Sequence, residues 1–368
     1  MSAVTPKLEA TLLALQVPHL GRSVAECDAL VNLAVDDGRA QIAIQAPIPG
    51  QAREDLERAV MDAAKGVEGI REVALTWQPG VLGRSVAKDD PVPQARNVIL
   101  VMSGKGGVGK STVAANLALA LRRMDARVGL LDADIYGPSV PTMFGVNGPP
   151  LSDGNKIQPL ERHGIKLMSI GFLLEDSRSA VIWRGPMLHG ALMQFLTDVA
   201  WGDLDYLVLD LPPGTGDIAL TLSQKLRSNG AVVVTTPQEV ALQDVYKAVA
   251  MNQKVGIPLL GVVENESYFV CDGCSRRHEL FGSGGGAKVA EMAGAPLLGQ
   301  IPIDMAIRQW GDAGTPVVEA SPGSSAGKEF MAVAARLAVQ IAVQNAENAG
   351  TLTIDRSGGV NRHLPIAR

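Results

Sequence analysis

The chain has 368 residues, of which 46% are hydrophobic and 40 are glycine, and its formal net charge is −5. This length exceeds one average domain, and the composition suits α/β units joined by short turns. The mild acidity, without a dense Lys/Arg stripe, argues against nucleic acid as a partner. No run of 18 apolar residues occurs and the N-terminal residues lack a signal pattern, so we expect a cytoplasmic protein with no membrane partner.

The first 80 residues are predicted to form a small α+β domain of their own. Helical spacing of apolar residues occurs over 6–15 and 54–64, and strand-like segments occur over 30–35, 40–46 and 71–77. The next residues are rich in Pro, Gly and charges and are predicted to be a linker. We therefore divide the chain into a domain over 1–80, a linker over 81–96, a main domain over 97–346 and a mobile tail over 347–368.

Apolar strands recur along the main domain, separated mostly by segments of helix length. They are expected at 98–102, 128–131, 167–170, 206–209, 232–235, 259–263 and 297–301. Strands that alternate with helices predict an α/β fold with a mostly parallel sheet covered on both faces. The apolar segment 328–343 is predicted to be a packed closing helix.

A phosphate-binding loop follows the first of these strands. Residues 103–112 read S-G-K-G-G-V-G-K-S-T and satisfy the spacing G-x-x-x-x-G-K-[ST]. The glycines let successive backbone N–H groups point into one anion-sized concavity, and the helix that follows adds its positive end. We expect Lys110 to reach the β- and γ-phosphates and Ser111 to bind Mg²⁺. The predicted nucleotide-binding residues of this P-loop NTPase are Gly104, Lys105, Gly106, Gly107, Val108, Gly109, Lys110, Ser111 and Thr112.

The second lysine of the loop, Lys105, has no role in an ordinary P-loop. A charge within about 4 Å of a phosphate is worth roughly 4 kcal/mol at an effective dielectric of 20. Lys105 is therefore predicted to stabilise transferring charge, and across a dimer interface it could act as an arginine finger does. The alternative is a surface lysine beside the loop.

Carboxylates end two of the predicted strands, where loops of a parallel sheet converge on a ligand. Asp210 ends Y-L-V-L-D, the position from which a carboxylate holds Mg²⁺, and L-P-P-G-T-G-D follows as a γ-phosphate sensor. In L-L-D-A-D-I-Y-G-P-S, Asp134 is predicted to orient the attacking water and to contribute to the Mg²⁺ site. Asp132 either assists that site or caps the loop. Asp217 is interpreted as a helix N-cap, and the alternative is a switch residue.

Three cysteines are too few for a disulfide framework in a chain of this length. Cys271 and Cys274 have the spacing C-x-x-C, which indicates metal or redox chemistry. Together with His278 they could supply three zinc ligands from one chain. A thioredoxin-like dithiol is disfavoured because the pair follows a nucleotide-fold strand and loop. Cys27 is interpreted as a small buried hydrophobe.

Five motifs together resemble the Mrp/ApbC family of iron–sulfur carrier ATPases. They read K-G-G-V-G-K-S-T, L-D-A-D-I-Y-G-P-S, D-L-P-P-G-T-G-D, V-V-E-N-E-S-Y-F-V-C-D-G-C and F-G-S-G-G-G, and the resemblance covers about 97–340. The family belongs to the deviant Walker A group with MinD, ParA and the nitrogenase iron protein. The N-terminal domain resembles the small iron–sulfur assembly domain often fused ahead of the ATPase. It has Ala46-Pro47-Ile48-Pro49 where such domains often carry Cys-Pro, and Glu266 stands where the family usually shows Met.

The resemblance implies a homodimer with nucleotide at the interface, in which Cys271 and Cys274 of each subunit bridge one [4Fe–4S] cluster. Four thiolates are needed and one chain supplies two at a suitable spacing, which agrees with two chains. Contacts of Asn265, Pro302 and Asp304 with the adenine base are also implied. The alternatives are a turn former for Asn265 and a helix N-cap for Asp304.

We therefore expect an iron–sulfur cluster carrier that uses ATP, Mg²⁺ and a labile [4Fe–4S] cluster, with slow hydrolysis of ATP to ADP and phosphate as a switch. Its expected partners are a second copy, cluster assembly scaffolds and recipient apoproteins. One alternative is a partition or positioning ATPase of the MinD/ParA type, which the C-x-x-C pair and the missing membrane anchor oppose. Another is a zinc-stabilised nucleotide-binding scaffold, which metal content would distinguish.

Overall fold

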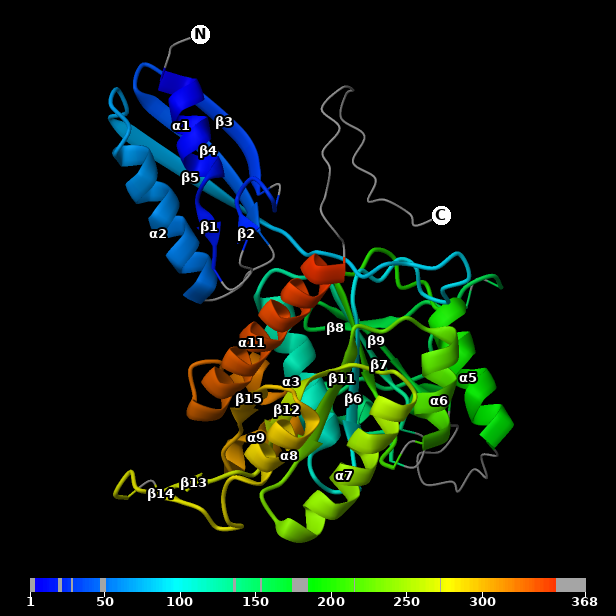
Figure 1. Ribbon diagram of the computed structural model, residues 1–368. Coiled ribbons are helices and arrows are strands. Elements are labelled where there is room, and N and C mark those ends of the chain that lie inside the picture. Colours follow the sequence, from blue (N-terminus) through cyan, green and yellow to red (C-terminus); the bar gives the residue numbers. More distant parts are fainter. Residues whose placement is uncertain are drawn as a thin grey trace. The chain divides into compact units, whose positions relative to one another are not determined.

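The structure is a computed structural model in which the chain forms two compact units, described here one at a time (Figure 1). Unit 1 runs to Gly83 and also includes the described residues from Ala338 on, and unit 2 spans Arg84–Leu337. The described residues are 4–18, 22–27, 29–46, 51–134, 137–152, 154–173, 185–214, 216–271 and 273–348. Most of the predicted tail at 347–368, and Pro47-Ile48-Pro49, lie outside them.

Unit 1 is an α+β structure in which the predicted helices and strands are present, while the short pair β1 and β2 was not foreseen. Strand β3 pairs antiparallel with β4, and β4 pairs parallel with β5 after the crossover through α2. The core forms where Leu8 and Leu12 of α1 and Leu56 of α2 meet Ile42 and Ile44 of β4. The elements are α1 Val4–Leu13, β1 Gln16–Val17, β2 Arg22–Ser23, β3 Leu30–Asp36, β4 Arg39–Ala46, α2 Gln51–Lys65 and β5 Glu72–Pro79.

Unit 2 is built on one eight-stranded sheet with helices between its strands. Its strands are β6 Val98–Ser103, β7 Val128–Asp132, β8 Leu160–Arg162, β9 Ile165–Ser169, β10 Tyr206–Asp210, β11 Gly230–Thr235, β12 Leu259–Glu264 and β15 Leu297–Gln300, and a hairpin adds β13 Phe269–Val270 and β14 Arg277–His278. Its helices are α3 Lys110–Arg123, α4 Val140–Phe144, α5 Gly185–Thr197, α6 Gly216–Lys225, α7 Glu239–Lys254, α8 Gly285–Ala293, α9 Met305–Asp312, α10 Val317–Ala320 and the first part of α11 Ser325–Asn348, with a 3₁₀ turn at Ile170–Leu173.

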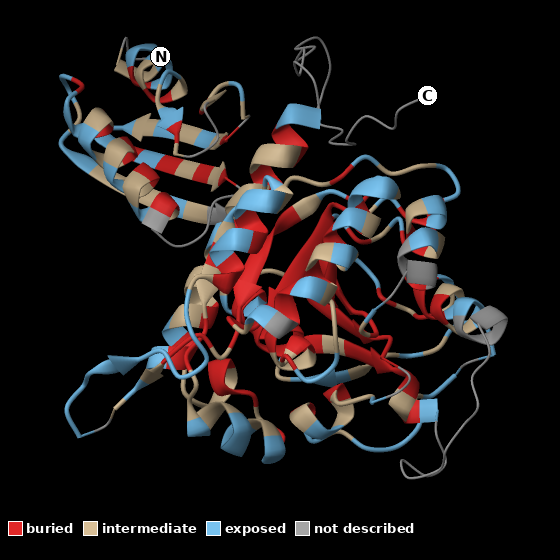
Figure 2. Cartoon of the chain, turned by 60° about the horizontal axis from the view of Figure 1, so that its bottom comes forward, coloured by how far each residue is buried: buried red, intermediate tan, exposed pale blue. Residues whose placement is uncertain are grey.

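The sheet order is β15-β12-β11-β6-β10-β7-β9-β8, and its neighbouring strands are parallel except β8, which is antiparallel to β9. The connection from β6 to β7 passes over β10, whereas that from β10 to β11 passes over β6 in the opposite direction. Since such crossovers are right-handed, α3 and α6 cover opposite faces. The strands between them are almost wholly buried (Figure 2). The predicted parallel, doubly covered α/β sheet is thus confirmed, while β8 was not foreseen.

The segment 81–96, predicted to be a linker, is largely packed. From Arg84 on it belongs to unit 2, where Val92 and Ala95 are buried. The Arg84 guanidinium forms a buried ion pair with Asp90 and donates to the carbonyl of Arg227 at 3.0 Å. Proline and charge suggested a solvated chain, but pairing of the two charges with each other allows their burial.

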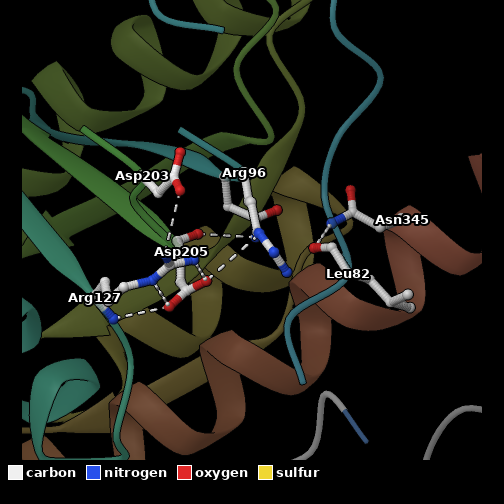
Figure 3. A network of polar contacts seen from close by, with 7 residues as sticks. Leu82, Arg96, Arg127, Asp203, Asp205 and Asn345 are labelled. Carbon is white, nitrogen blue, oxygen red and sulfur yellow. Dashed lines mark hydrogen bonds and ion pairs between the residues drawn. The ribbon is translucent and has the colours of Figure 1, made fainter. Parts of the chain in front are cut away.

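A polar network ties together the amino ends of the central strands of unit 2 (Figure 3). The Asp205 carboxylate, just before β10, accepts two hydrogen bonds from the Arg127 guanidinium at 3.0 and 3.1 Å, and Arg96 lies 3.6 Å away. The Arg127 backbone N–H donates to the same carboxylate at 2.9 Å. This bidentate contact fixes the start of β7 against the start of β10. Among the described helices of the whole chain, none is long and apolar enough to span a bilayer.

Candidate functional site

The phosphate-binding loop lies at the point where the strand order of the sheet reverses. It follows β6, whose neighbours are β10 on one side and β11 on the other, and it leads directly into α3. Gly109 precedes the helix with φ 78°, so its backbone has the left-handed conformation that favours glycine. The first N–H groups of α3 therefore lie at the carboxyl ends of the strands, where a helix N-terminus stabilises an anion.

Two glycines of the loop are also required by packing. A Cβ atom at Gly104 would lie 2.4 Å from the backbone of Asp244 and Val245 in α7. At Gly109 it would lie 2.2 Å from the side-chain amide of Asn265. The motif therefore satisfies two demands, because the same glycines that expose N–H groups let α7 and the loop after β12 approach.

Lys110 is held at the carboxyl ends of the strands by two aspartates. Its Nζ atom lies 2.5 Å from Asp210 Oδ1, 3.5 Å from Asp134 Oδ2 and 3.3 Å from Ser111 Oγ. The Lys110 side chain is only 6% exposed and that of Asp210 is fully buried. The structure thus brings together four predicted site residues from β10, the loop after β7 and α3. In this arrangement the lysine neutralises carboxylates at the place where phosphates would bind.

The Asp210 carboxylate is suited to a divalent cation. Burial raises its pKa, and the charge and hydrogen bond of Lys110 act in the opposite direction. Its Oδ2 atom is buried without a hydrogen-bond partner among the described residues, which is costly for a carboxylate. A hard cation with oxygen ligands would satisfy this atom, and Ser111 supplies a nearby hydroxyl. The residues therefore fit the predicted Mg²⁺ site.

Asp132 organises the loop that follows β7, which was one of its two expected roles. The sheet register sets it beside Asp210, and it accepts from the backbone N–H groups of Asp134 at 3.1 Å and Val140 at 3.2 Å. Ser169 Oγ donates to it at 3.0 Å. Burial, and secondarily the charge of Asp210, raise the pKa of Asp132 to about 7. Its contacts position Asp134 on the side of Lys110.

The remaining predicted contacts of the loop are only partly visible. Lys105 is half-buried, and its carbonyl accepts from Ser103 Oγ at 2.9 Å. Helix α6 begins at Gly216, so Asp217 lies inside its first turn and not before it, as an N-cap would. That N-cap interpretation was wrong, because the helix starts at Gly216, two residues before Ile218, where the apolar pattern begins.

The three residues expected near adenine lie at the ends of β12 and β15. Asn265 donates its side-chain amide to the Val108 carbonyl in the loop at 2.9 Å. Pro302 is buried and is the second residue after the end of β15. Asp304 is the N-cap of α9 and accepts from the N–H of Ala306 at 2.8 Å, which agrees with its alternative interpretation. None of these contacts requires a nucleotide, and the contact of Asn265 with the loop was not foreseen.

The C-x-x-C pair lies on a hairpin that stands out from unit 2 (Figure 1). We call residues 269–278 the thiol hairpin. Its antiparallel strands β13 and β14 pair through Val270 and Arg277, and the N–H of Cys271 donates to the carbonyl of Arg276 at 3.0 Å. Cys274 is exposed and Cys271 half-buried, and both are thiols. The hairpin therefore carries two soft ligands in one chain, of which Cys274 is exposed.

The zinc alternative finds no support in the described part of the chain. No group of three His, Cys, Asp or Glu residues there is placed to hold one metal ion, so His278 does not complete a site with the two thiols. Cys27 lies in unit 1 beside its apolar core, and burial raises the pKa of its thiol. Its interpretation as a packing residue agrees with that environment.

The fold, the glycine loop and the lysine between two carboxylates define a nucleotide-binding P-loop NTPase. Comparison with protein families makes the class narrower. The chain belongs to the family described as NUBPL iron-transfer P-loop NTPase, whose model matches residues 94–338. A second family model, iron-sulfur cluster assembly protein, matches residues 7–77.

Curated relatives and solved structures are similar over most of these regions. An iron-sulfur cluster carrier protein from Synechocystis is 43% identical over 89% of this chain and 95% of its own length. The iron-sulfur cluster carrier protein from Escherichia coli K12 is 42% identical over 93% of this chain and 92% of its own length. A nucleotide-binding protein from Archaeoglobus fulgidus, solved in complex with ADP and with cobalt, is 43% identical with a TM-score of 0.53, over 60% of this chain and 87% of its own.

Proposed function

We propose that this protein carries a labile [4Fe–4S] cluster between two copies of the chain and transfers it to apoproteins, with ATP as the switch. The observation that carries the proposal is the pair of free cysteines on the thiol hairpin, Cys271 and Cys274, of which Cys274 is exposed. A cluster of this type takes four thiolates and the hairpin provides two, so a second copy completes the ligand set. The iron–sulfur cluster is the cargo, and relatives bearing the carrier name support this role.

The nucleotide site supports slow hydrolysis of ATP by water to ADP and phosphate. The loop N–H groups and Lys110 bind the phosphates, while Ser111 and Asp210 hold Mg²⁺ beside them. Asp134 orients the attacking water, since its carboxylate lies at the edge of this site, 3.5 Å from Lys110 Nζ. Lys105 acts from the partner subunit on the transferring phosphoryl group. On the other side, Asn265, Pro302 and Asp304 flank the base, with Asp304 also fixing the start of α9.

The proposal is tested by anaerobic reconstitution with iron and sulfide, followed by iron, sulfide and zinc analysis. We expect about four irons and four sulfides per dimer, and a loss of both in Cys271→Ser/Cys274→Ser. The matched control is Cys27→Ser, which removes a thiol from unit 1 and leaves the hairpin ligands in place. Transfer of the cluster is then monitored through the activity that the recipient apoprotein gains.

Stoichiometric zinc without sulfide would overturn the carrier proposal, as would full loading in the double serine variant. Loading of a monomer with four irons would leave a carrier but refute the bridging geometry. Size-exclusion chromatography with light scattering under anaerobic conditions distinguishes these results, because it gives the mass of the loaded species.

A further inference from the structure

Glu264 is a fully buried carboxylate at the end of β12. It has no role in the hydrolysis proposed above. Its Oε1 atom accepts from Ser267 Oγ at 2.5 Å and from Gln300 Nε2 at 2.8 Å, and its Oε2 atom accepts from the N–H of Gly286 at 2.5 Å. These donors belong to the turn after β12, to β15 and to α8. One carboxylate therefore joins three separate elements through neutral donors, which offsets the cost of its burial.

The glycine-rich run F-G-S-G-G-G allows α8 to reach this carboxylate. A Cβ atom at Gly286 would lie 2.7 Å from Glu264 Cβ, and one at Gly285 would lie 2.7 Å from the carbonyl of Pro237. Larger residues would push the start of α8 away from β12. The motif thus serves the packing around Glu264.

On the nucleotide side, the residues that follow Glu264 contact the phosphate-binding loop. Asn265 donates its side-chain amide to the carbonyl of Val108 at 2.9 Å and its backbone N–H to Thr235 at 2.7 Å. Glu266 then has φ 52°, a left-handed conformation that costs a non-glycine residue energy. The hydrogen bond from Ser267 to Glu264 closes the turn over residues 264–267. Because Asn265 in this turn is bound to Val108, a shift of Val108 would move the whole turn.

On the thiol side, Gln300 links Glu264 to the thiol hairpin. Its Oε1 atom accepts from Arg277 Nη2 at 3.3 Å, and the Arg277 guanidinium lies 3.8 Å from the centroid of the Tyr268 ring. Arg277 pairs across the hairpin with Val270, the residue directly before Cys271. The position of the first thiol is therefore set in part by Gln300.

We propose that Glu264 is a positioning residue that couples occupancy of the phosphate-binding loop to the geometry of the two hairpin thiols. The link runs from Val108 through Asn265 and Glu264 to Gln300 and Arg277. A nucleotide bound to the loop N–H groups fixes the Val108 peptide, and the turn after β12 responds because Asn265 holds its carbonyl. Both sites bias one shared element, which is what a coupling free energy requires.

This inference rests on the proposed role of Cys271 and Cys274 as cluster ligands, but its test uses the full chain without an iron–sulfur cluster. Alkylation of each cysteine by iodoacetamide is measured by peptide mass spectrometry, with and without Mg²⁺ and a non-hydrolysable ATP analogue, and Cys27 is the internal reference. In the wild type we expect the nucleotide to change the rate at Cys271 and Cys274 by about fivefold or more. Nucleotide affinity is measured for every variant by calorimetry.

Three variants decide the outcome. Glu264→Gln and Arg277→Met are expected to bind the nucleotide but to lose its effect on the thiols. Arg276→Met removes the same charge from the same hairpin without touching the contact to Gln300, and it is expected to retain the effect. A residue with a purely structural role would change the alkylation rate equally with and without nucleotide, so the ratio of the two rates is the readout.

The proposal is overturned if the wild type shows no nucleotide effect, if a folded Glu264→Gln or Arg277→Met keeps it, or if Arg276→Met loses it to the same extent. Should Glu264→Gln fail to fold, Arg277→Met still decides, because Arg277 is exposed. A failed cluster reconstitution together with a retained nucleotide effect would refute the carrier function and leave the coupling in place.

Discussion

Lys110 determines the charge balance of the nucleotide site, because it is the cation in contact with two buried or nearly buried aspartates. Removing one partner of a buried ion pair leaves an uncompensated charge. We therefore predict that Lys110→Ala abolishes nucleotide binding and also destabilises the nucleotide-free protein, by about 3 kcal/mol at pH 7.5. Calorimetry measures the loss of nucleotide binding, and urea denaturation measures the loss of stability.

The stability loss of Lys110→Ala should depend on pH. Burial already raises the pKa of Asp210 above its unfolded value near 3.8, and the variant lacks the lysine that opposes this shift. Between the unfolded and the folded pKa the native state binds more protons than the unfolded state, so stability falls as pH rises. The deficit relative to wild type is thus smaller at pH 5 than at pH 7.5. Lys105→Ala removes the same charge from the same loop and should show little stability deficit at either pH. If Lys105→Ala and Lys110→Ala lost the same stability, the assigned contact of Lys110 with the buried aspartates would be contradicted.

Sequence spacing was sufficient to predict the site residues that belong to a motif. It was insufficient to predict the residues whose role depends on packing. The strand ends predicted that Lys110, Asp134 and Asp210 converge, since parallel strands share one carboxyl edge. Glu264 gave no such signal, because its three donors come from residues 3, 22 and 36 positions away. Contacts at such separations depend on how the helices pack, which periodicity does not encode.

At the scale of elements, the Asp205 network fastens the end of the sheet opposite the nucleotide site. We predict that Asp205→Asn lowers the free energy of unfolding by about 1–3 kcal/mol, because the charge-assisted bonds to Arg127 are lost. Nucleotide affinity should stay unchanged, since the loop follows the other end of β6. Urea denaturation and calorimetry check the two halves. A variant with Asp203→Asn, whose side chain is 84% exposed, serves as control and should be near neutral.

The elements that the sequence predicted well are those with long, strongly apolar patterns. Strands β6, β7, β10 and β11 are each buried along their length, and each lies within two residues of its expected position. The short strands of the thiol hairpin have two residues each, too few to show a periodicity of two. Turn closure and the pairing of Val270 with Arg277 create them instead.

At the scale of the whole molecule, the last helix contributes to both compact units. From Ala338 on, α11 belongs to unit 1, where Ala342 is buried in the core and Asn345 donates to the carbonyl of Leu82 at 2.9 Å. From the sequence we assigned this helix to the main domain alone. A continuous apolar pattern does not indicate the residue at which a helix stops packing in one unit and starts packing in the other.

A division of the chain at Gly83 should therefore leave part of α11 without its core. We predict that a fragment of residues 84–348 binds the dye ANS more strongly and self-associates more than a fragment of residues 84–337, since the former exposes the apolar surface around Ala342 that unit 1 normally covers. Dye fluorescence and light scattering at matched concentrations measure this, with the full chain as reference. Equal dye binding by the two fragments would mean that the end of α11 does not depend on residues 1–83 for its burial.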